Sequence, residues 1–164
     1  MSIPWPLYTF ILIELIFVTY LDIKYRKIKN VWSSINLFFA GLLFFIFPDL
    51  YPFTVESFQF TFVFILAGFM LFLMKIMGGG DSKFLATIFL LIPLRFQDTV
   101  FYYLLISTII IGSISFIQNI IINWDSIANA VRSKEKGAIR KCFGRKFPYA
   151  PVVLLTWGWF GWTI

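Results

Sequence analysis

The sequence contains no histidine among its 164 residues, and it contains a single cysteine, Cys142. Without histidine, a Ser-His-Asp or Cys-His catalytic site, a histidine metal site and H-E-x-x-H chemistry are all excluded. One cysteine cannot form an internal disulfide framework or a cysteine-based metal cluster. Any catalysis by this chain must therefore use other side chains.

Charged residues are also scarce, at 13% of the chain, whereas 60% of the residues are hydrophobic and 21% are aromatic. A soluble domain of this size cannot bury so much apolar surface, so we expect a lipid bilayer to cover it. The apolar residues recur in runs, most of which approach the roughly 20 residues that a helix needs to cross the hydrocarbon core. The sequence therefore predicts an all-α, polytopic membrane protein.

Six transmembrane helices are expected from these runs. They lie at about residues 5–21, 31–48, 58–77, 82–97, 99–122 and 149–163. The fourth has an apolar part of only 11 residues, Phe84 to Leu94, so we expect it to begin inside the membrane at the glycines that precede it. Irregular backbone at such a depth is tolerated only where protein or a wet cavity covers it. This part of the chain is therefore a candidate site.

The basic residues predict the orientation of the helices. The loops after the first, third and fifth expected spans carry four, two and seven of the 14 Lys and Arg residues, and only Arg95 falls on the other side. By the positive-inside rule these three loops face the cytoplasm, so the N- and C-termini are expected outside. The net charge of +6 follows from this topology and gives no reason to expect a nucleic-acid partner.

Carboxylates carry most of the remaining catalytic possibilities, and there are eight of them. Three lie at or inside the membrane, namely Glu14, Asp22 and Asp81. The other five are expected to be solvated acids of the loops. These are Asp49, Glu56, Asp98, Asp125 and Glu135.

Asp22 and Asp81 form the candidate catalytic pair. Asp22 ends the first expected span and Asp81 opens the fourth, both on the predicted cytoplasmic side, so the two carboxylates lie at the same membrane depth. Two acids at close range share one proton. One can take a proton from water while the other, protonated, hydrogen-bonds to an amide carbonyl and later protonates the leaving nitrogen. This chemistry requires neither a metal nor a cofactor.

Each acid of the pair has a lysine two residues later, Lys24 or Lys83, and Asp81 also follows three glycines. Glycines can adopt backbone angles closed to other residues, and they let a substrate or a neighbouring helix come close. The lysines could tune the charge, contact substrate, or snorkel to lipid headgroups. An ordinary turn beside an interfacial charge would give the same pattern, so the residues alone leave both interpretations open.

The string Gly78-Gly79-Gly80-Asp81 matches the Gly-x-Gly-Asp signature of membrane aspartyl proteases, and Lys83 extends it to Gly-x-Gly-Asp-x-Lys. Together with the stretch from Asp22 to Asn30, it resembles the type IV prepilin peptidase family. Lys29 stands where that family usually has proline. The string Pro148-Tyr149-Ala150 looks like the stretch that opens the last helix of the family. The resemblance spans nearly the whole chain, in the expected order and spacing.

The resemblance implies a membrane aspartyl endopeptidase, a single domain over residues 1–164 with Asp22 and Asp81 as its catalytic pair. Only nine residues, Ile23 to Val31, separate the first two expected spans, so the methyltransferase insertion of larger members is missing. The chain is similar to short, protease-only members that serve Tad-type pili or archaeal pilins. The implied substrate is a prepilin with a basic leader and an apolar helix, cut at the cytoplasmic face of the inner membrane. The basic inner loops should repel such a leader.

Glu14 lies within the first expected span, where an acid is costly and marks function by default. It could pair with Lys24, Lys75 or Lys83, or sit protonated between helices. We favour the structural role and leave it out of the catalytic pair.

Other interpretations stay open. A presenilin-like protease is disfavoured because no Pro-Ala-Leu motif occurs. A non-enzymatic scaffold or transporter component would use the acids to bind ions or to hold helices together, although the repeated halves of transporters are not visible beyond the two Asp-x-Lys pairs. The loop at about residues 123–146 could form an amphipathic surface helix or be a simple connector.

Overall fold

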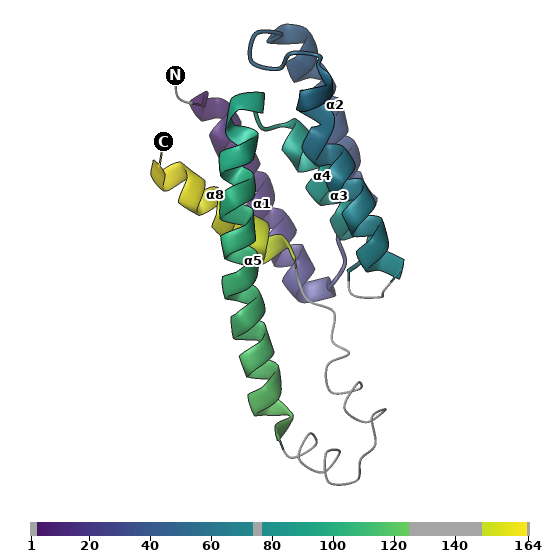
Figure 1. The fold of residues 1–164 in the computed structure, drawn as a ribbon, viewed down its shortest axis with the longest axis vertical. Coiled ribbons are helices and arrows are strands. Elements are labelled where there is room, and N and C mark those ends of the chain that lie inside the picture. The colour runs from purple at the N-terminus through teal and green to yellow at the C-terminus, as the bar shows by residue number, and fades with distance from the viewer. Residues whose placement is uncertain (1–2, 74–76, 125–148, 164) are drawn as a thin grey trace.

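A computed structural model describes residues 3–73, 77–124 and 149–163 (Figure 1). The helices of this part of the chain are α1 (Trp5–Tyr25), α2 (Asn30–Ile46), α3 (Val55–Leu73), α4 (Gly79–Leu90), α5 (Leu94–Ile122) and α8 (Ala150–Thr163). The same residues form no strand, so the all-α prediction is confirmed. The surface helix considered at about residues 123–146 falls almost entirely outside the described residues.

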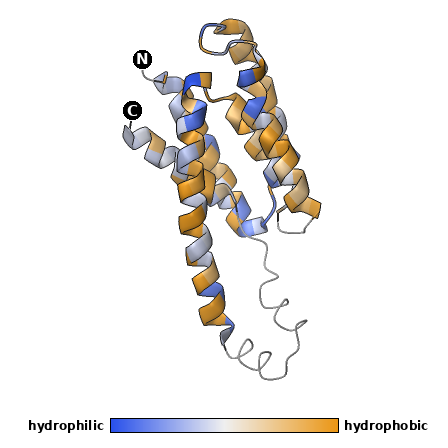
Figure 2. Cartoon of the chain, in the orientation of Figure 1, coloured by the Kyte–Doolittle hydropathy of each residue, from blue (hydrophilic) through white to orange (hydrophobic). Residues whose placement is uncertain are grey.

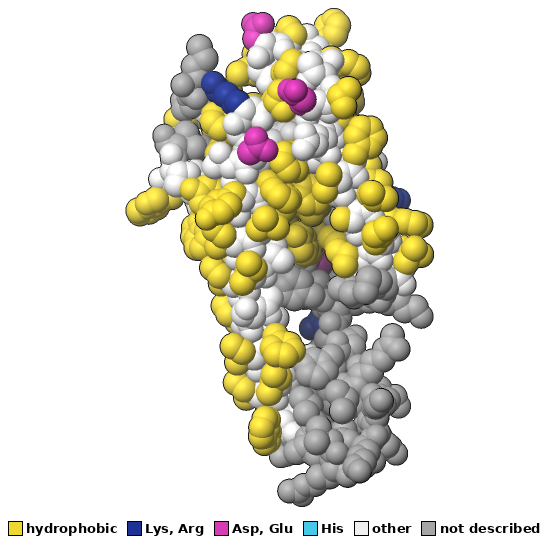
Figure 3. All heavy atoms as spheres, viewed as in Figure 1, with side chains coloured by type: hydrophobic (Ala, Val, Ile, Leu, Met, Phe, Trp, Pro, Cys, Tyr) yellow, Lys and Arg dark blue, Asp and Glu magenta, His cyan; other side chains and the backbone are white. Residues whose placement is uncertain are grey.

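Three of the helices, α1, α3 and α5, are long and apolar enough to cross a membrane, and α2 is a shorter apolar helix of 17 residues. Hydrophobic residues make up much of the described helices (Figure 2), and apolar side chains cover much of the face seen in Figure 3. Phe45 of α2, for example, is 88% exposed, and Phe62 of α3 is 64% exposed. Such a large exposed apolar surface marks contact with lipid. The chain is therefore a multi-helix membrane protein.

The fourth helix is shorter than predicted. It begins at the glycines, as expected, but it ends at Leu90 instead of near residue 97, and α5 begins at Leu94 instead of 99. Pro93 occupies the N-cap of α5, and a proline cannot continue the hydrogen bonding of the preceding helix because it has no N–H. The 12 residues of α4 extend about 18 Å at roughly 1.5 Å per residue. This length is well below the roughly 30 Å of a hydrocarbon core.

Two acids lie in helices instead of the predicted loops, because α3 and α5 begin at Val55 and Leu94, earlier than predicted. Glu56 lies in the first turn of α3, and Asp98 lies near the start of α5. Both side chains are exposed, as is Asp49 in the turn before α3. The expected exposure of these three acids is confirmed, whereas the loop position of Glu56 and Asp98 is wrong. Asp125 and Glu135 lie outside the described residues.

The buried end of α4 is closed by side chains from neighbouring segments. Gln97 of α5 donates from Nε2 to the carbonyl oxygens of Phe89 and Ile92, at 3.2 and 3.1 Å. The Tyr51 hydroxyl donates to the Leu91 carbonyl at 2.7 Å. Backbone carbonyls without partners are expensive in a bilayer. These contacts therefore allow a helix shorter than the membrane to end within the protein.

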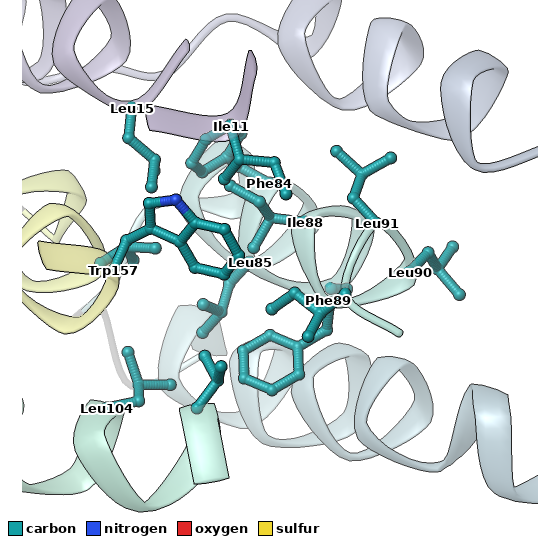
Figure 4. Close-up of a cluster of buried hydrophobic side chains, with 14 of the residues drawn as sticks. Ile11, Leu15, Phe84, Leu85, Ile88, Phe89, Leu90, Leu91, Leu104 and Trp157 are labelled. Atoms are coloured by element: carbon teal, nitrogen blue, oxygen red, sulfur yellow. The ribbon is translucent and has the colours of Figure 1, made fainter. Parts of the chain in front are cut away.

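The hydrophobic core is centred on α4. Figure 4 shows Phe84 and Ile88 of this helix among side chains from three others, namely Leu15 of α1, Leu104 of α5 and Trp157 of α8. All five side chains are at most 2% exposed. The short helix is thus held by longer ones on several sides.

The helices pack in two groups. α4 packs closely against α3 and α2, and α8 packs closely against α5 and α1 (Figure 1). We call the first group the α4 half and the second the α8 half. The backbones of the two halves approach each other at few points. Buried apolar side chains from both halves fill the space between the halves. The end of α1, the end of α3 and the start of α4 meet around one cavity, whereas the start of α1 and the end of α8 lie away from it (Figure 1). Which end faces the cytoplasm stays a prediction.

Gly68 of α3 allows a close helix contact within the α4 half. A Cβ built on Gly68 would overlap the Ser82 side chain of α4, whereas a Cβ on Gly112 of α5 would meet no atom within 4 Å. We expect Gly68→Ala to lower the free energy of unfolding by about 1–3 kcal/mol through overpacking. The control Gly112→Ala should leave it unchanged or raise it by up to about 1 kcal/mol. Denaturant titrations in one detergent measure both, and equal effects would contradict the close contact.

Candidate active site

Asp22 is buried near the end of α1, with 2% of its surface exposed. Its Oδ2 accepts a hydrogen bond of 3.1 Å from the backbone N–H of Ala150, the first residue of α8. The N–H of Tyr149 is a second backbone donor to this carboxyl group. Two segments 128 residues apart therefore meet at this acid. The N-terminus of a helix also favours its negative charge.

Asp81 lies in the first turn of α4 and is partly buried. Its Oδ2 accepts a hydrogen bond of 3.0 Å from the N–H of Gly78, the N-cap residue. An acid at this position often bonds back to the start of its helix. Both candidate acids thus accept backbone N–H groups at a helix N-terminus, α8 for Asp22 and α4 for Asp81.

The two acid-bearing segments touch at Gly80. A Cβ on this residue would overlap the carbonyl oxygen of Ile28, which lies in the linker between α1 and α2. Backbones can approach so closely because Gly80 has no side chain. At Gly79 a Cβ would meet only the Phe72 ring, at an ordinary 3.6 Å. The three glycines therefore differ in role, and Gly80 is the one that joins the segments.

The linker after α1 reaches Gly80 through a turn at Arg26. This residue has φ 50° and ψ 38°, and it is the only non-glycine residue with positive φ in the described part of the chain. The left-handed conformation costs roughly 1–2 kcal/mol for such a residue. The Arg26 N–H donates to the Asp22 carbonyl at 2.7 Å. Sequence reasoning missed Arg26 and Ile28, because nothing in their residue types indicates these backbone roles.

A cavity of about 1090 Å³ opens beside these contacts. Its wall is formed by the linker after α1, the end of α3 and the start of α4. Its charged lining residues are Arg26, Lys27, Lys29, Asp81 and Lys83. Asp22 is not among the described residues of the wall. The cavity is large enough for a peptide segment. Basic residues outnumber acidic ones in its wall, so the wall should repel a basic leader, as the sequence also predicts.

The two lysines of the Asp-x-Lys pairs are not equivalent. Lys83 lines the cavity. Lys24 instead places its Nζ over the rings of Tyr20 and Tyr25, at 5.7 and 5.3 Å from their centroids. Cation–π contacts of this kind hold a lysine at an exposed site. The structure therefore brings Lys83, but not Lys24, to the wall of the cavity.

Tyr149 lies beside Asp22 and is joined to the α5 helix. Its hydroxyl lies 3.3 Å from Oγ1 of Thr108. This hydroxyl therefore connects the start of α8 to the middle of α5. Among the described residues, no group of three or more His, Cys, Asp or Glu side chains could hold a metal ion.

The sequence of this chain matches a known protein family. Residues 9–117 match the family model of the type IV leader peptidases. The chain belongs to this family. The matched region runs from α1 into α5 and includes Asp22, Asp81 and the three glycines. No match was found among curated proteins or among solved structures. Membership of the type IV leader peptidase family implies a peptidase, and the apolar helices place it in a membrane.

Glu14 is buried in α1, with 4% of its surface exposed. Neither of its carboxyl oxygens has a hydrogen-bond partner among the described residues. Lys24 lies against tyrosine rings and Lys83 lines the cavity, so the ion pairs considered from the sequence are not seen at these two lysines. Lys75 lies outside the described residues.

Proline at Ala150 would test the backbone donor to Asp22. The first position of a helix tolerates proline, because its N–H has no partner within the helix. Ala150→Pro removes the N–H that binds Asp22. A hydrogen bond to a charged group contributes about 1.5–3 kcal/mol, so we expect peptidase activity to fall by about 10- to 100-fold.

Ala150→Gly is the matched control, because it retains the N–H and adds no atoms. Its activity should stay close to that of the parent. Initial rates of cleavage in lipid nanodiscs measure both variants. Equal rates for the proline and glycine variants would show that this hydrogen bond does not matter to the reaction.

Proposed function

We propose that this leader peptidase is an aspartic endopeptidase with Asp22 and Asp81 as its catalytic pair. Its substrates would be prepilin-like precursors of the Tad/Flp type or archaeal pilin precursors, which it would cut between a basic leader and an apolar helix. One observation carries the proposal. The contact between Gly80 and Ile28 joins the two acid-bearing segments beside a cavity that is large enough for a peptide.

In the proposed reaction, one carboxylate takes a proton from a water molecule while the water oxygen attacks the scissile carbonyl carbon. The other acid, protonated, donates a hydrogen bond to the carbonyl oxygen, and a proton then passes to the leaving nitrogen as the C–N bond breaks. The backbone N–H groups of Ala150 and Gly78 would hold the two carboxyl groups in orientation. Asp22 belongs to the α8 half and Asp81 to the α4 half, so the pair forms across the boundary between them.

The substrate would lie with its apolar helix in the bilayer and its leader on the cytoplasmic side of the inner membrane. The scissile peptide would enter the cavity at Asp81, and Lys83, which lines the cavity, would contact it. Lys24 would act at a distance through its charge. The cationic residues of the wall would not bind the positive leader, so we expect the cavity to hold the neutral backbone near the cut.

The test is a cleavage assay with the full-length protein in lipid nanodiscs. A panel of prepilins would be incubated with the protein, and the products would be identified by gel shift and N-terminal sequencing. We expect one cut between the leader and the apolar helix. A cut within the apolar helix would favour a presenilin-like protease. If a folded sample cuts no member of the panel, the scaffold or transporter interpretation replaces this proposal.

A further inference from the structure

Two buried polar side chains meet at the boundary between the halves. Glu14 of α1 is 4% exposed and Asn36 of α2 is 0% exposed. The Asn36 side chain lies near the Glu14 carboxyl group. Among the described residues, neither side chain has a partner in hydrogen-bond geometry. A carboxyl and an amide are thus placed opposite each other in an otherwise apolar environment.

Stability does not explain this arrangement. Buried polar groups in native proteins are nearly always hydrogen-bonded, and each exception needs a reason. Apolar residues of similar size, at both positions, would be as easy or easier to bury. The reaction proposed above does not use either side chain. The pair therefore has a role that leucines could not fill.

The position of the pair indicates that role. Glu14 lies on the helix that carries Asp22, eight residues or about 12 Å before it along the helix axis. Asn36 lies on α2, which starts at the cavity wall with Asn30 and packs against α4, the helix that carries Asp81. A bond between Glu14 and Asn36 would link the helix that carries Asp22 to a helix that packs against the one carrying Asp81.

We propose that Glu14 and Asn36 are positioning residues, whose hydrogen bonding across the boundary between the halves sets the approach of Asp81 to Asp22. A neutral carboxyl group can donate its O–H to Oδ1 of Asn36 and accept from Nδ2, so the two side chains are complementary. Such interhelical bonds between polar side chains hold membrane helices together. The inference rests on the proposed catalytic pair.

The first test replaces both partners with leucine. The double variant Glu14→Leu/Asn36→Leu should keep or raise the unfolding temperature, because replacing both partners of a buried polar pair with apolar side chains is nearly neutral or stabilising. Its kcat for leader cleavage should fall by about 10- to 100-fold with KM unchanged, since misplacement by about 1 Å can have that effect. A purely structural pair would not lower kcat in a protein whose stability is retained.

Two single variants are matched controls. Glu14→Gln keeps the size and the complementary donor and acceptor, so it should retain most of the activity. Thr19→Val also removes a buried hydroxyl without a partner from α1. Thr19 is five residues from Glu14, or about 140° around the helix, so this variant should leave kcat unchanged. A loss with Glu14→Gln as large as that of the double variant would overturn the proposal.

A distance measurement tests the inference without relying on cleavage. Spin labels would be attached to Phe45→Cys of α2 and Trp162→Cys of α8 in a Cys142→Ser background. These side chains are 88% and 92% exposed and lie one in each half. We expect the double leucine variant to shift or broaden the label distance, and Thr19→Val to preserve it. An unchanged distance in the double variant, or unchanged kcat, would overturn the inference. If the parent cuts no prepilin, the proposed function fails and the distance alone decides the coupling.

Discussion

Replacing Asp81 with asparagine should lower the rate of leader cleavage by about 10²- to 10⁴-fold, the range for loss of a general acid or base. Asparagine has nearly the same size, and its Oδ1 can still accept the Gly78 N–H that Asp81 accepts. The start of α4 should therefore be preserved, whereas proton transfer at this position is lost. Asp22→Asn should behave in the same way, because the amide oxygen can still accept the Ala150 N–H.

The control for both variants is Asp98→Asn, which changes an exposed acid of α5 and should leave the rate unchanged. Single-turnover rates with one prepilin, together with unfolding temperatures, separate loss of chemistry from loss of folding. Residues that act as a unit give non-additive losses, so the double variant should be no slower than the slower single one. Parental rates in either single variant would rule out the catalytic pair.

Gly80→Ala should lower cleavage by about 10²-fold, the loss expected when a catalytic group is misplaced by about 1 Å. The added Cβ would overlap the Ile28 carbonyl oxygen, and backbone cannot yield as a flexible side chain can. The start of α4 and the linker after α1 would have to move apart, and Asp81 would move with α4. Alanine is otherwise the better helix former, so the loss would arise from the contact alone.

Gly79→Ala is the matched control on the same turn of α4. Its Cβ would make ordinary contact with the Phe72 ring at 3.6 Å. Activity should remain near the parental level, with stability unchanged or slightly higher. Cleavage rates and denaturation of the two variants in the same lipid would be compared. Similar behaviour of the two alanine variants would show that the approach to Ile28 is not required.

The features predictable from sequence were those that depend on local pattern. Runs of apolar residues predicted the helices, and the short apolar part from Phe84 to Leu94 indicated that the fourth helix would be unusual. Three glycines before Asp81 predicted where that helix begins, because the break is local. The end of the same helix was misplaced by several residues. Apolar residues continue past Leu90 to Leu94, whereas the observed break depends on Pro93 and on donors from Tyr51 and Gln97.

The site was predictable in composition but not in arrangement. Sequence reasoning named Asp22 and Asp81, yet it could not assign the first a partner 128 residues away. It treated the three glycines alike, although the contact that separates Gly80 from Gly79 is made with a distant linker. The sequence indicated that burying Glu14 is costly, but it did not indicate that Asn36 lies beside it. A single polar residue in an apolar run does not show which residue of another helix it contacts. These features depend on packing between segments that the residue pattern does not specify.

The closure of α4 by Gln97 and Tyr51 has a consequence for how the enzyme is set in the bilayer. The depth of a helix that spans the whole membrane is set by the lipid, because the two ends of the helix lie at the two membrane interfaces. α4 is instead anchored to protein at its Leu90 end, and Asp81 lies nine residues away, about 14 Å along a rigid rod. The depth of the Asp81 carboxyl group is therefore set by the contacts of Tyr51 and Gln97 at the other end of α4. A thinner or thicker membrane would move the substrate relative to the acid, but not the acid relative to the protein.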